Sequence, residues 1–158
     1  MLYGRFAPKM YAVCLRYSNN AEDACDLLQD GFIKVYKNLE KYRGEGSFEG
    51  WIRRIFVNTS IEHFRRKTKI GNTTEPHENH VEDIEPTAMD MLAEKDIIQL
   101  IQQLSPGYRQ VFNMYVVEGY THKEIGEILG ISEGTSKSQL ARAKVILQKM
   151  VQEKLQNS

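Results

Sequence analysis

Apolar residues recur at three- and four-residue intervals along most of the chain, the spacing that places side chains on one face of an α-helix. The first such stripe covers residues 6–17. Asn20 is a suitable N-cap for a second helix, which the apolar spacing extends to about Lys41. Ser47 follows a glycine-bearing turn and predicts the start of a third helix over 48–67. The residues expected to face inward are Phe6, Met10, Val13, Cys14, Tyr17, Ala24, Leu27, Leu28, Val35, Leu39, Trp51, Ile52, Ile55, Phe56 and Ile61.

A second group of helices is predicted after residue 90. Helical spacing restarts over 91–104, and Ser105-Pro106 marks a new helix start because proline suits the first helical position. Strand signals are almost absent throughout, so we expect an all-α protein. The inward residues expected here are Leu92, Ile97, Leu100, Ile101, Leu104, Tyr108, Val111, Phe112 and Tyr115.

The most specific local pattern lies between residues 120 and 148. Thr121 is expected to cap a short helix that Gly130 ends, and Ser132 to cap a longer helix over 133–147. Two helices joined in this way are typical of a helix-turn-helix that reads duplex DNA. The alternative, a merely solvated charged face, is less favoured because of the capped turn. The outer face of the second helix offers donors and acceptors for phosphates and base edges at Ser136, Lys137, Gln139, Arg142 and Lys144.

Residues 70–90 separate the two groups and show no helical spacing. They contain two prolines and six acidic residues without Lys or Arg, which predicts a flexible, acidic linker between two small helical domains. His77 and His80 have a spacing that metal ligands use. Chance is the favoured interpretation, because no cysteine cluster or rigid scaffold accompanies them.

Composition limits the possibilities further. The 158 residues suit one ordinary domain or two small ones, and the formal net charge of zero predicts no polyanion partner by itself. No apolar run is long enough to insert in a membrane, and residues 1–5 lack the apolar core of a secretion signal. Cys14 and Cys25 are interpreted as reduced, buried residues rather than a disulfide, so we expect a cytoplasmic protein.

The predicted third helix combines cations with aromatic side chains. Between Arg53 and Lys69, six Lys and Arg residues face only Glu62 as an opposing charge, and Phe48, Trp51, Phe56 and Phe64 are interleaved with the basic residues. Unpaired DNA is bound by this combination, because cations follow the phosphates while rings receive unstacked bases. For Trp51, Ile52 and Ile55 the favoured alternative is core packing.

Residues 22–36 resemble the polymerase-binding helix of extracytoplasmic-function (ECF) sigma factors, in the sigma-70 family. That helix carries an acid-Leu-apolar-Gln-acid-x-Phe run, which Asp26 to Phe32 match. The second domain is similar to the promoter-reading domain of the same family at Leu104-Ser105-Pro106, at 119–126 and at 134–138. The first helix opens almost at Met1, where family members usually have more residues, so its first turn is expected to be incomplete.

The resemblance implies that residues 1–69 form sigma region 2, residues 70–90 the linker, and residues 91–158 the region 4 helix-turn-helix. Region 2 would bind core RNA polymerase, at the coiled coil of its largest subunit, and would capture and melt the −10 element. A loop over 42–48 would receive a flipped base. The implied polymerase-binding residues are Asp26, Leu27, Gln29, Asp30 and Phe32. The −10 residues are Arg53, Arg54, Asn58, Ile61, Glu62, His63, Arg65, Arg66 and Lys67, although Glu62 stands where the family commonly has Asp.

Region 4 would read the −35 element as duplex DNA and contact the flap of the second-largest polymerase subunit. The implied −35 residues are Thr121, Ser132, Thr135, Ser136, Lys137, Gln139, Arg142 and Lys144. The resemblance also implies an anti-sigma factor as a partner, and a linker that lies in a basic RNA channel as a nucleic-acid mimic; a plain tether is an equal alternative.

No catalytic constellation emerges, so neither an enzyme nor a cofactor or metal is expected. Two rival functions are a stand-alone helix-turn-helix regulator, which would bind duplex DNA without polymerase, and a nucleic-acid enzyme with the basic helix as its substrate groove. Gel shifts with and without core polymerase distinguish a sigma factor from the stand-alone regulator. Loss of activity with a chelator would identify the nucleic-acid enzyme.

Overall fold

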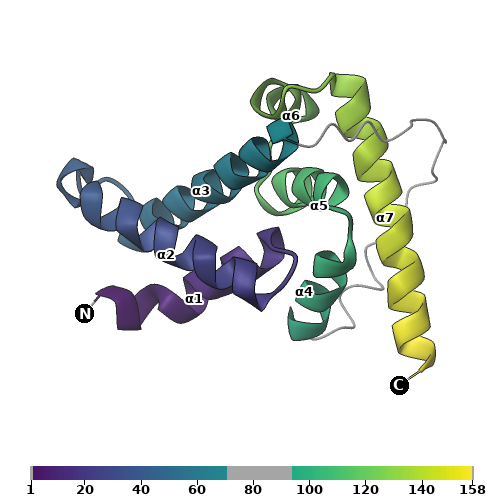
Figure 1. Cartoon of the computed structure of the whole chain (residues 1–158), viewed down its shortest axis with the longest axis horizontal. Helices are drawn as coiled ribbons and strands as arrows, with labels where there is room; N and C mark the ends of the chain where they lie inside the picture. The colour runs from purple at the N-terminus through teal and green to yellow at the C-terminus, as the bar shows by residue number, and fades with distance from the viewer. Residues whose placement is uncertain (1, 71–93, 158) are drawn as a thin grey trace. The chain divides into compact units, whose positions relative to one another are not determined.

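The computed structural model describes residues 2–70 and 94–157, and every regular element in these ranges is a helix (Figure 1). The all-α prediction is therefore confirmed. The chain divides into two compact units, Met1–Gly71 and Asn72–Ser158. The predicted linker lies outside the described residues apart from Ile70, which ends a helix. In the described part of the chain, no helix is both long and apolar enough to cross a membrane.

The first unit is a bundle in which three long helices pack against one another pairwise. Helix α1 starts at the second residue, and its predicted apolar stripe is buried throughout. Asn20 caps α2 by accepting the Asp23 amide hydrogen bond at 2.9 Å, and Ser47 accepts the Gly50 amide at 3.0 Å to cap α3. The elements are α1 (Leu2–Tyr17), α2 (Ala21–Lys37), the short 3₁₀ turn η1 (Leu39–Lys41) and α3 (Phe48–Ile70).

Three predictions for α2 and the turn after it are wrong. The helix ends at Lys37 rather than near Lys41, because the Asn38 amide and side chain both bond the Lys34 carbonyl and the backbone tightens into η1. Leu39 consequently lies partly exposed instead of facing the core. Cys25 is exposed although a buried position was expected, whereas Cys14 is fully buried and both thiols are free. Burial raises the pKa of Cys14 to about 12, so this thiol is unreactive at neutral pH.

The second unit is built around its last helix, which packs on three of the others. Pro106 occupies the first position of α5 as predicted, and the last helix extends nine residues beyond the expected end at Leu147. The elements are α4 (Glu94–Gln103), α5 (Pro106–Phe112), the π-helical turn η3 (Asn113–Val117), α6 (His122–Leu129) and α7 (Glu133–Gln156).

The π-helical turn η3 changes which side chains face the core. A π turn adds a residue to the helical repeat and rotates the following side chains away from the spacing of 3.6 residues. Met114 is fully buried as a result, and Tyr115, which was predicted to face inward, is exposed. A further departure lies in α4, where Ile98 is buried and Ile97, which was predicted to face inward, is only partly buried.

A buried arginine fixes the joint between α4 and α5. Arg109 is 4% exposed and donates hydrogen bonds to the carbonyl oxygens of Ile101, Gln102 and Leu104 at 3.2, 3.0 and 2.7 Å. These are carbonyls at the end of α4, which lack partners within the helix itself. The arginine is thus a helix cap supplied by the next element, a role that local sequence spacing does not indicate.

Candidate functional site

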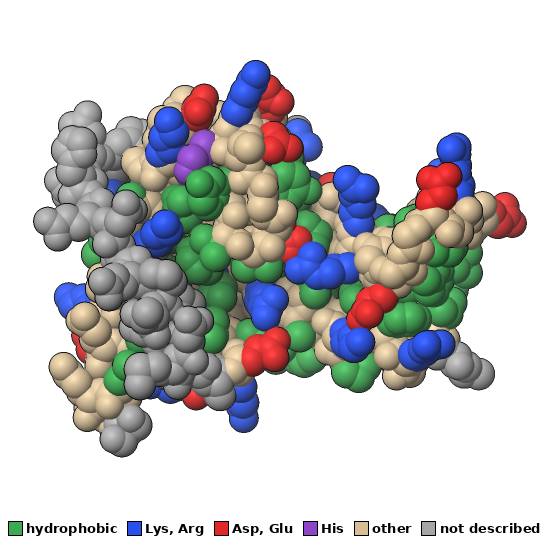
Figure 2. All heavy atoms as spheres, turned by 180° about the vertical axis from the view of Figure 1, so that it is seen from behind, with side chains coloured by type: hydrophobic (Ala, Val, Ile, Leu, Met, Phe, Trp, Pro, Cys, Tyr) green, Lys and Arg blue, Asp and Glu red, His purple; other side chains and the backbone are tan. Residues whose placement is uncertain are grey.

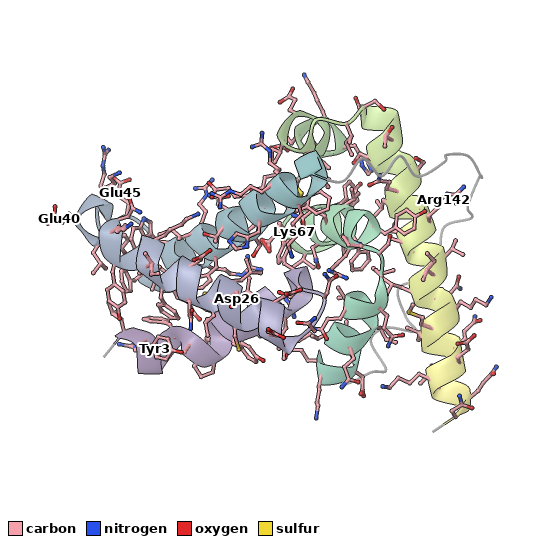
Figure 3. All side chains as sticks on the ribbon, viewed as in Figure 1. Tyr3, Asp26, Glu40, Glu45, Lys67 and Arg142 are labelled. Atoms are coloured by element: carbon pink, nitrogen blue, oxygen red, sulfur yellow. The ribbon has the colours of Figure 1, made fainter. Side chains whose placement is uncertain are left out.

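The outer face of α2 carries the acidic residues that were predicted to bind a basic partner. Asp26 and Gln29 are exposed, and Figure 3 marks Asp26 on this helix. Asp30 lies one turn further along, with its side chain 48% exposed. Leu27 and Phe32 are 5% and 4% exposed, so these two predicted contact residues are core residues instead. Leu27 and Phe32 pack α2 against the bundle from its opposite face, so Asp26 and Asp30 face outward.

Two large apolar residues extend the acidic face. Ile33 and Tyr36 are each about half-exposed, at 51% and 50%, and stand on α2 one turn beyond the acids. Tyr3 of α1, 52% exposed, packs against the Phe32 ring in a tilted arrangement with 4.8 Å between centroids, and the Tyr36 centroid lies 6.5 Å from that of the same ring. Hydrophobic side chains also gather at the surface over this unit in Figure 2. Exposed apolar side chains beside charges are typical of a protein-binding surface, and helical spacing alone had not distinguished them.

Helix α3 is tied to α2 by two polar contacts. His63 and Asp30 are 2.7 Å apart between Nε2 and Oδ2, and Lys34 donates a hydrogen bond to Glu62. The Lys34 hydrogen bond holds the pKa of Glu62 below its usual range. Two residues predicted to face DNA, Glu62 and His63, therefore contact the helix predicted to bind polymerase.

The remainder of the predicted DNA surface of α3 is largely exposed. Ile61 is an exception, because it is 5% exposed and packs in the core, so we remove it from the DNA-contacting set. Figure 3 shows Lys67 near the end of α3, far along the unit from Glu40 and Glu45. The cationic end of α3 is thereby separated from the acids near the α2–α3 connection. The exposed residues are Arg54, Asn58, Arg65, Arg66 and Lys67, with Arg53 partly exposed.

An aromatic cluster forms the base of the loop over 42–48. The Phe48 and Trp51 rings stack with 5.7 Å between centroids and 18° between planes, and Tyr42 packs against both. The Tyr42 hydroxyl donates a hydrogen bond to the Gly46 carbonyl at 2.7 Å, which closes the loop. Ile52 is fully buried as predicted for core packing, whereas Trp51 and Ile55 are only partly buried.

The helix-turn-helix of the second unit forms as the sequence predicted. Thr121 and Glu124 make a reciprocal capping box, with bonds of 3.1 and 3.0 Å. This bonding lowers the pKa of Glu124. Gly130 ends α6 in the left-handed conformation at φ 72°, and Ser132 accepts the Thr135 amide bond that caps α7. Both caps and the glycine are confirmed.

The turn also requires a second glycine that sequence reasoning missed. Gly126 accepts hydrogen bonds from the amides of Gly130 and Ile131. A Cβ at Gly126 would lie 2.6 Å from the Ile131 carbonyl oxygen, closer than atoms tolerate. The turn can therefore approach α6 closely only because this position has no side chain.

Gly126→Ala is expected to destabilise the second unit by about 1–2 kcal/mol. The overlap with the turn outweighs the roughly 1 kcal/mol that alanine gains over glycine in a helix. Urea unfolding followed by circular dichroism measures the change. Trp51, the single tryptophan of the chain, lies in the first unit, so its fluorescence transition should not move. An unchanged circular dichroism transition would show that the turn adjusts freely.

The DNA-facing set of the second unit needs one correction. Ser136 is fully buried, and its hydroxyl oxygen lies 2.8 Å from His122 Nδ1, so it supports α6 instead of reaching outward. Lys137 is exposed and reaches Glu133 at 3.7 Å. Figure 3 marks Arg142 on α7. The other predicted residues are exposed at Thr121 and Ser132, and partly exposed at Thr135, Gln139, Arg142 and Lys144.

The described side chains contain no group of three or more His, Cys, Asp or Glu able to hold a metal ion. His77 and His80 lie outside the described residues.

Comparison with protein families finds two adjacent matches. The model for sigma-70 region 2 matches residues 2–70, and a model for sigma-70 region 4 matches residues 94–147. These ranges coincide closely with the helices of the first unit and with the second unit up to the middle of α7.

Characterised relatives resemble the chain over nearly all its length. The ECF RNA polymerase sigma factor SigE of Mycolicibacterium smegmatis is 31% identical over 148 residues, covering 90% of this chain, which spans 57% of that relative. The ECF RNA polymerase sigma-E factor of Haemophilus influenzae is 28% identical, covering 96% of this chain and 86% of the relative. Among solved structures, the sigma factor RpoE of Bartonella quintana, in complex with the anti-sigma factor NepR, has a TM-score of 0.53 at 21% identity. The structural match covers 95% of this chain and 94% of the RpoE chain, and it supports the fold.

Proposed function

The chain belongs to the sigma-70 family of RNA polymerase sigma factors, in the ECF group, and from this premise we propose how its surfaces direct promoter-specific initiation. The observation that carries the proposal is the separation of charge within the first unit. An acidic and apolar face lies on α2, and a cationic, aromatic-bearing helix lies beside it. One surface suits a basic protein partner, and the other suits DNA.

The first unit, assigned to residues 1–69, binds core polymerase through Asp26, Gln29 and Asp30, with Ile33 and Tyr36 adding apolar contact. The coiled coil of the largest subunit is the proposed partner. On the same unit, α3 follows the phosphates of the melted −10 element, and the loop over 42–48 receives a flipped base above its aromatic cluster. Captured bases and phosphate contacts offset the few kcal/mol that each unstacked step costs.

The second unit, assigned to residues 91–158, docks the start of α7 in the major groove of the −35 element and contacts the flap of the second-largest subunit. Residues 70–90 connect the two units. Action on polymerase places the protein in the cytoplasm. An anti-sigma partner is part of the proposal, supported by the solved complex of RpoE with NepR.

Arg142→Ala is expected to weaken binding to promoter duplex by about 1–3 kcal/mol if the guanidinium reads a base edge. Arg142 is partly exposed on α7, and its Nε is buried without a hydrogen-bond partner among the described residues. Binding is measured on the promoter duplex and on an unrelated duplex of equal length. An equal loss on both duplexes would restrict Arg142 to phosphate contacts.

The decisive experiment is in vitro transcription with core polymerase on a genomic fragment library, with mapping of the start sites that depend on this protein. We expect start sites that share two sequence elements. Gel shifts with and without core polymerase provide the second arm. Equally strong, specific duplex binding without polymerase would favour a stand-alone helix-turn-helix regulator, and failure to associate with core enzyme would refute the proposal.

A further inference from the structure

His122 is held by two neighbours at the first position of α6. Its Nδ1 lies 2.8 Å from the hydroxyl oxygen of Ser136, which is fully buried on α7. Its ring stacks on Tyr115 of the π turn, with 4.3 Å between centroids and 15° between planes. A hydrogen bond in the ring plane and a stack on the ring face together fix both the rotation and the tilt of the imidazole. Three elements thus converge to orient one side chain.

The remaining ring nitrogen of His122 is the atom left for another partner. Nδ1 is committed to Ser136, and within residues 2–70 and 94–157 the structure gives Nε2 no hydrogen-bond partner. The side chain is partly exposed at the start of the helix-turn-helix, beside the exposed Thr121. Because Nδ1 is fixed by Ser136, Nε2 is the ring atom able to donate a hydrogen bond to a ligand.

The charges around His122 favour an anion. Lys137 and Lys144 of α7 act on the ring with positive charge, and Glu133 is the opposing acid on that helix. On α6 itself, Lys123 is exposed and Glu124 is engaged in the capping box with Thr121. Tyr115 is the titratable group that η3 presents to the ring. The surroundings are therefore cationic overall, as a contact with a DNA phosphate requires.

We propose that His122 donates a hydrogen bond from Nε2 to a DNA phosphate of the −35 duplex, and that Ser136 and Tyr115 are positioning residues for this contact. The inference rests on the proposed function of the second unit. It adds a residue absent from the predicted DNA-contacting set, and it explains why a serine on the recognition helix is buried.

Proton uptake accompanies this contact. Burial, and then the charge of Lys137, lowers the pKa of His122, so the ring is neutral in the free protein at neutral pH. A bound phosphate favours the charged ring and raises that pKa, so the complex binds a proton that the free protein lacks. DNA affinity therefore rises as the pH falls from about 7.5 to about 6. The Ser136 hydroxyl can accept from the charged ring or donate to the neutral one, so its hydrogen bond survives in both states.

Two matched substitutions separate the contact from its support. In His122→Asn the amide reaches the position of Nδ1, so the bond to Ser136 can persist while the Nε2 donor is lost. In His122→Gln the amide reaches the position of Nε2, so a donor persists but cannot titrate. We expect His122→Asn to weaken duplex binding about three- to tenfold. His122→Gln should retain binding at pH 7.5 and lose the gain at pH 6.

The experiment uses the full chain with core polymerase. The probe is a duplex whose start site was mapped by transcription, titrated at pH 7.5 and pH 6 with circular dichroism as the fold control. Ser136→Ala, which frees the ring to rotate, should give an intermediate loss. Wild-type affinity and pH dependence in His122→Asn would overturn the inference and leave His122 as a structural residue. If the wild-type protein itself does not bind the duplex, the proposed function fails, and this inference fails with it.

Discussion

Asp26→Lys is expected to reduce affinity for core RNA polymerase about ten- to a hundredfold while leaving the fold intact. Asp26 is exposed on α2 and takes part in no ion pair among the described residues, so reversing its charge breaks no ion pair within them. A basic partner docked on this face would instead meet a like charge, which costs about 1.4–2.8 kcal/mol in affinity. Fluorescence anisotropy of labelled protein titrated with core enzyme measures the change.

The matched control is Glu40→Lys. Glu40 is also an exposed acid of the first unit, and Figure 3 shows it at the end of the unit distant from Asp26. The net charge changes equally in the two variants, so only docking on the α2 face distinguishes them. Equal losses would indicate a general charge effect, and no loss in either variant would exclude this face. Asp30 is less suitable for reversal, because its substitution would also remove the partner of His63.

Helical spacing predicted most of the fold because several of the helices carry their own start signal. Asn20, Thr121 and Ser132 were assigned as caps from residue type and position alone, and each accepts the expected amide bond. Capping depends on residues three positions apart, which is why a single sequence contains the information. Gly130 was predicted from residue type as well, because the left-handed conformation that ends α6 favours glycine.

The departures occur where tertiary structure overrides local spacing. The π turn at Asn113–Val117 rotates the helix face, so Tyr115 is exposed against the regular pattern. Ser136 resembles an outward donor in sequence, yet it is buried because His122, fourteen residues earlier, supplies its partner. Contacts between residues far apart in the chain have no local signal. Family resemblance also placed Leu27 and Phe32 among contact residues, although the α2 helix turns them inward.

Gly31 is the position where a single added methyl group is expected to destabilise the first unit most. A Cβ at Gly31 would overlap the ring of Phe56 on α3, which is 1% exposed and packs edge-on against Phe32 at 5.1 Å. The ring is almost fully buried, so relieving the overlap requires the α2–α3 approach to open. Gly31→Ala should therefore lower the free energy of unfolding by about 3 kcal/mol, even after the gain in helix propensity of about 1 kcal/mol.

Gly4→Ala is the matched control for Gly31→Ala, because the added Cβ on α1 would meet no atom within 4 Å. It should be neutral or slightly stabilising. Urea unfolding followed by Trp51 fluorescence measures both variants, since this residue lies in the first unit.

Phe56→Leu tests whether the overlap causes the loss in Gly31→Ala. Leucine removes the ring that the added methyl group meets, so the double variant should be more stable than the sum of the two single losses by about 1–2 kcal/mol. The cavity left by the smaller side chain makes Phe56→Leu destabilising alone, which is why the comparison is with the sum. Strict additivity would mean that the two residues do not interact. The glycine would then be required by something other than the close packing of the two helices that carry the proposed polymerase and DNA surfaces.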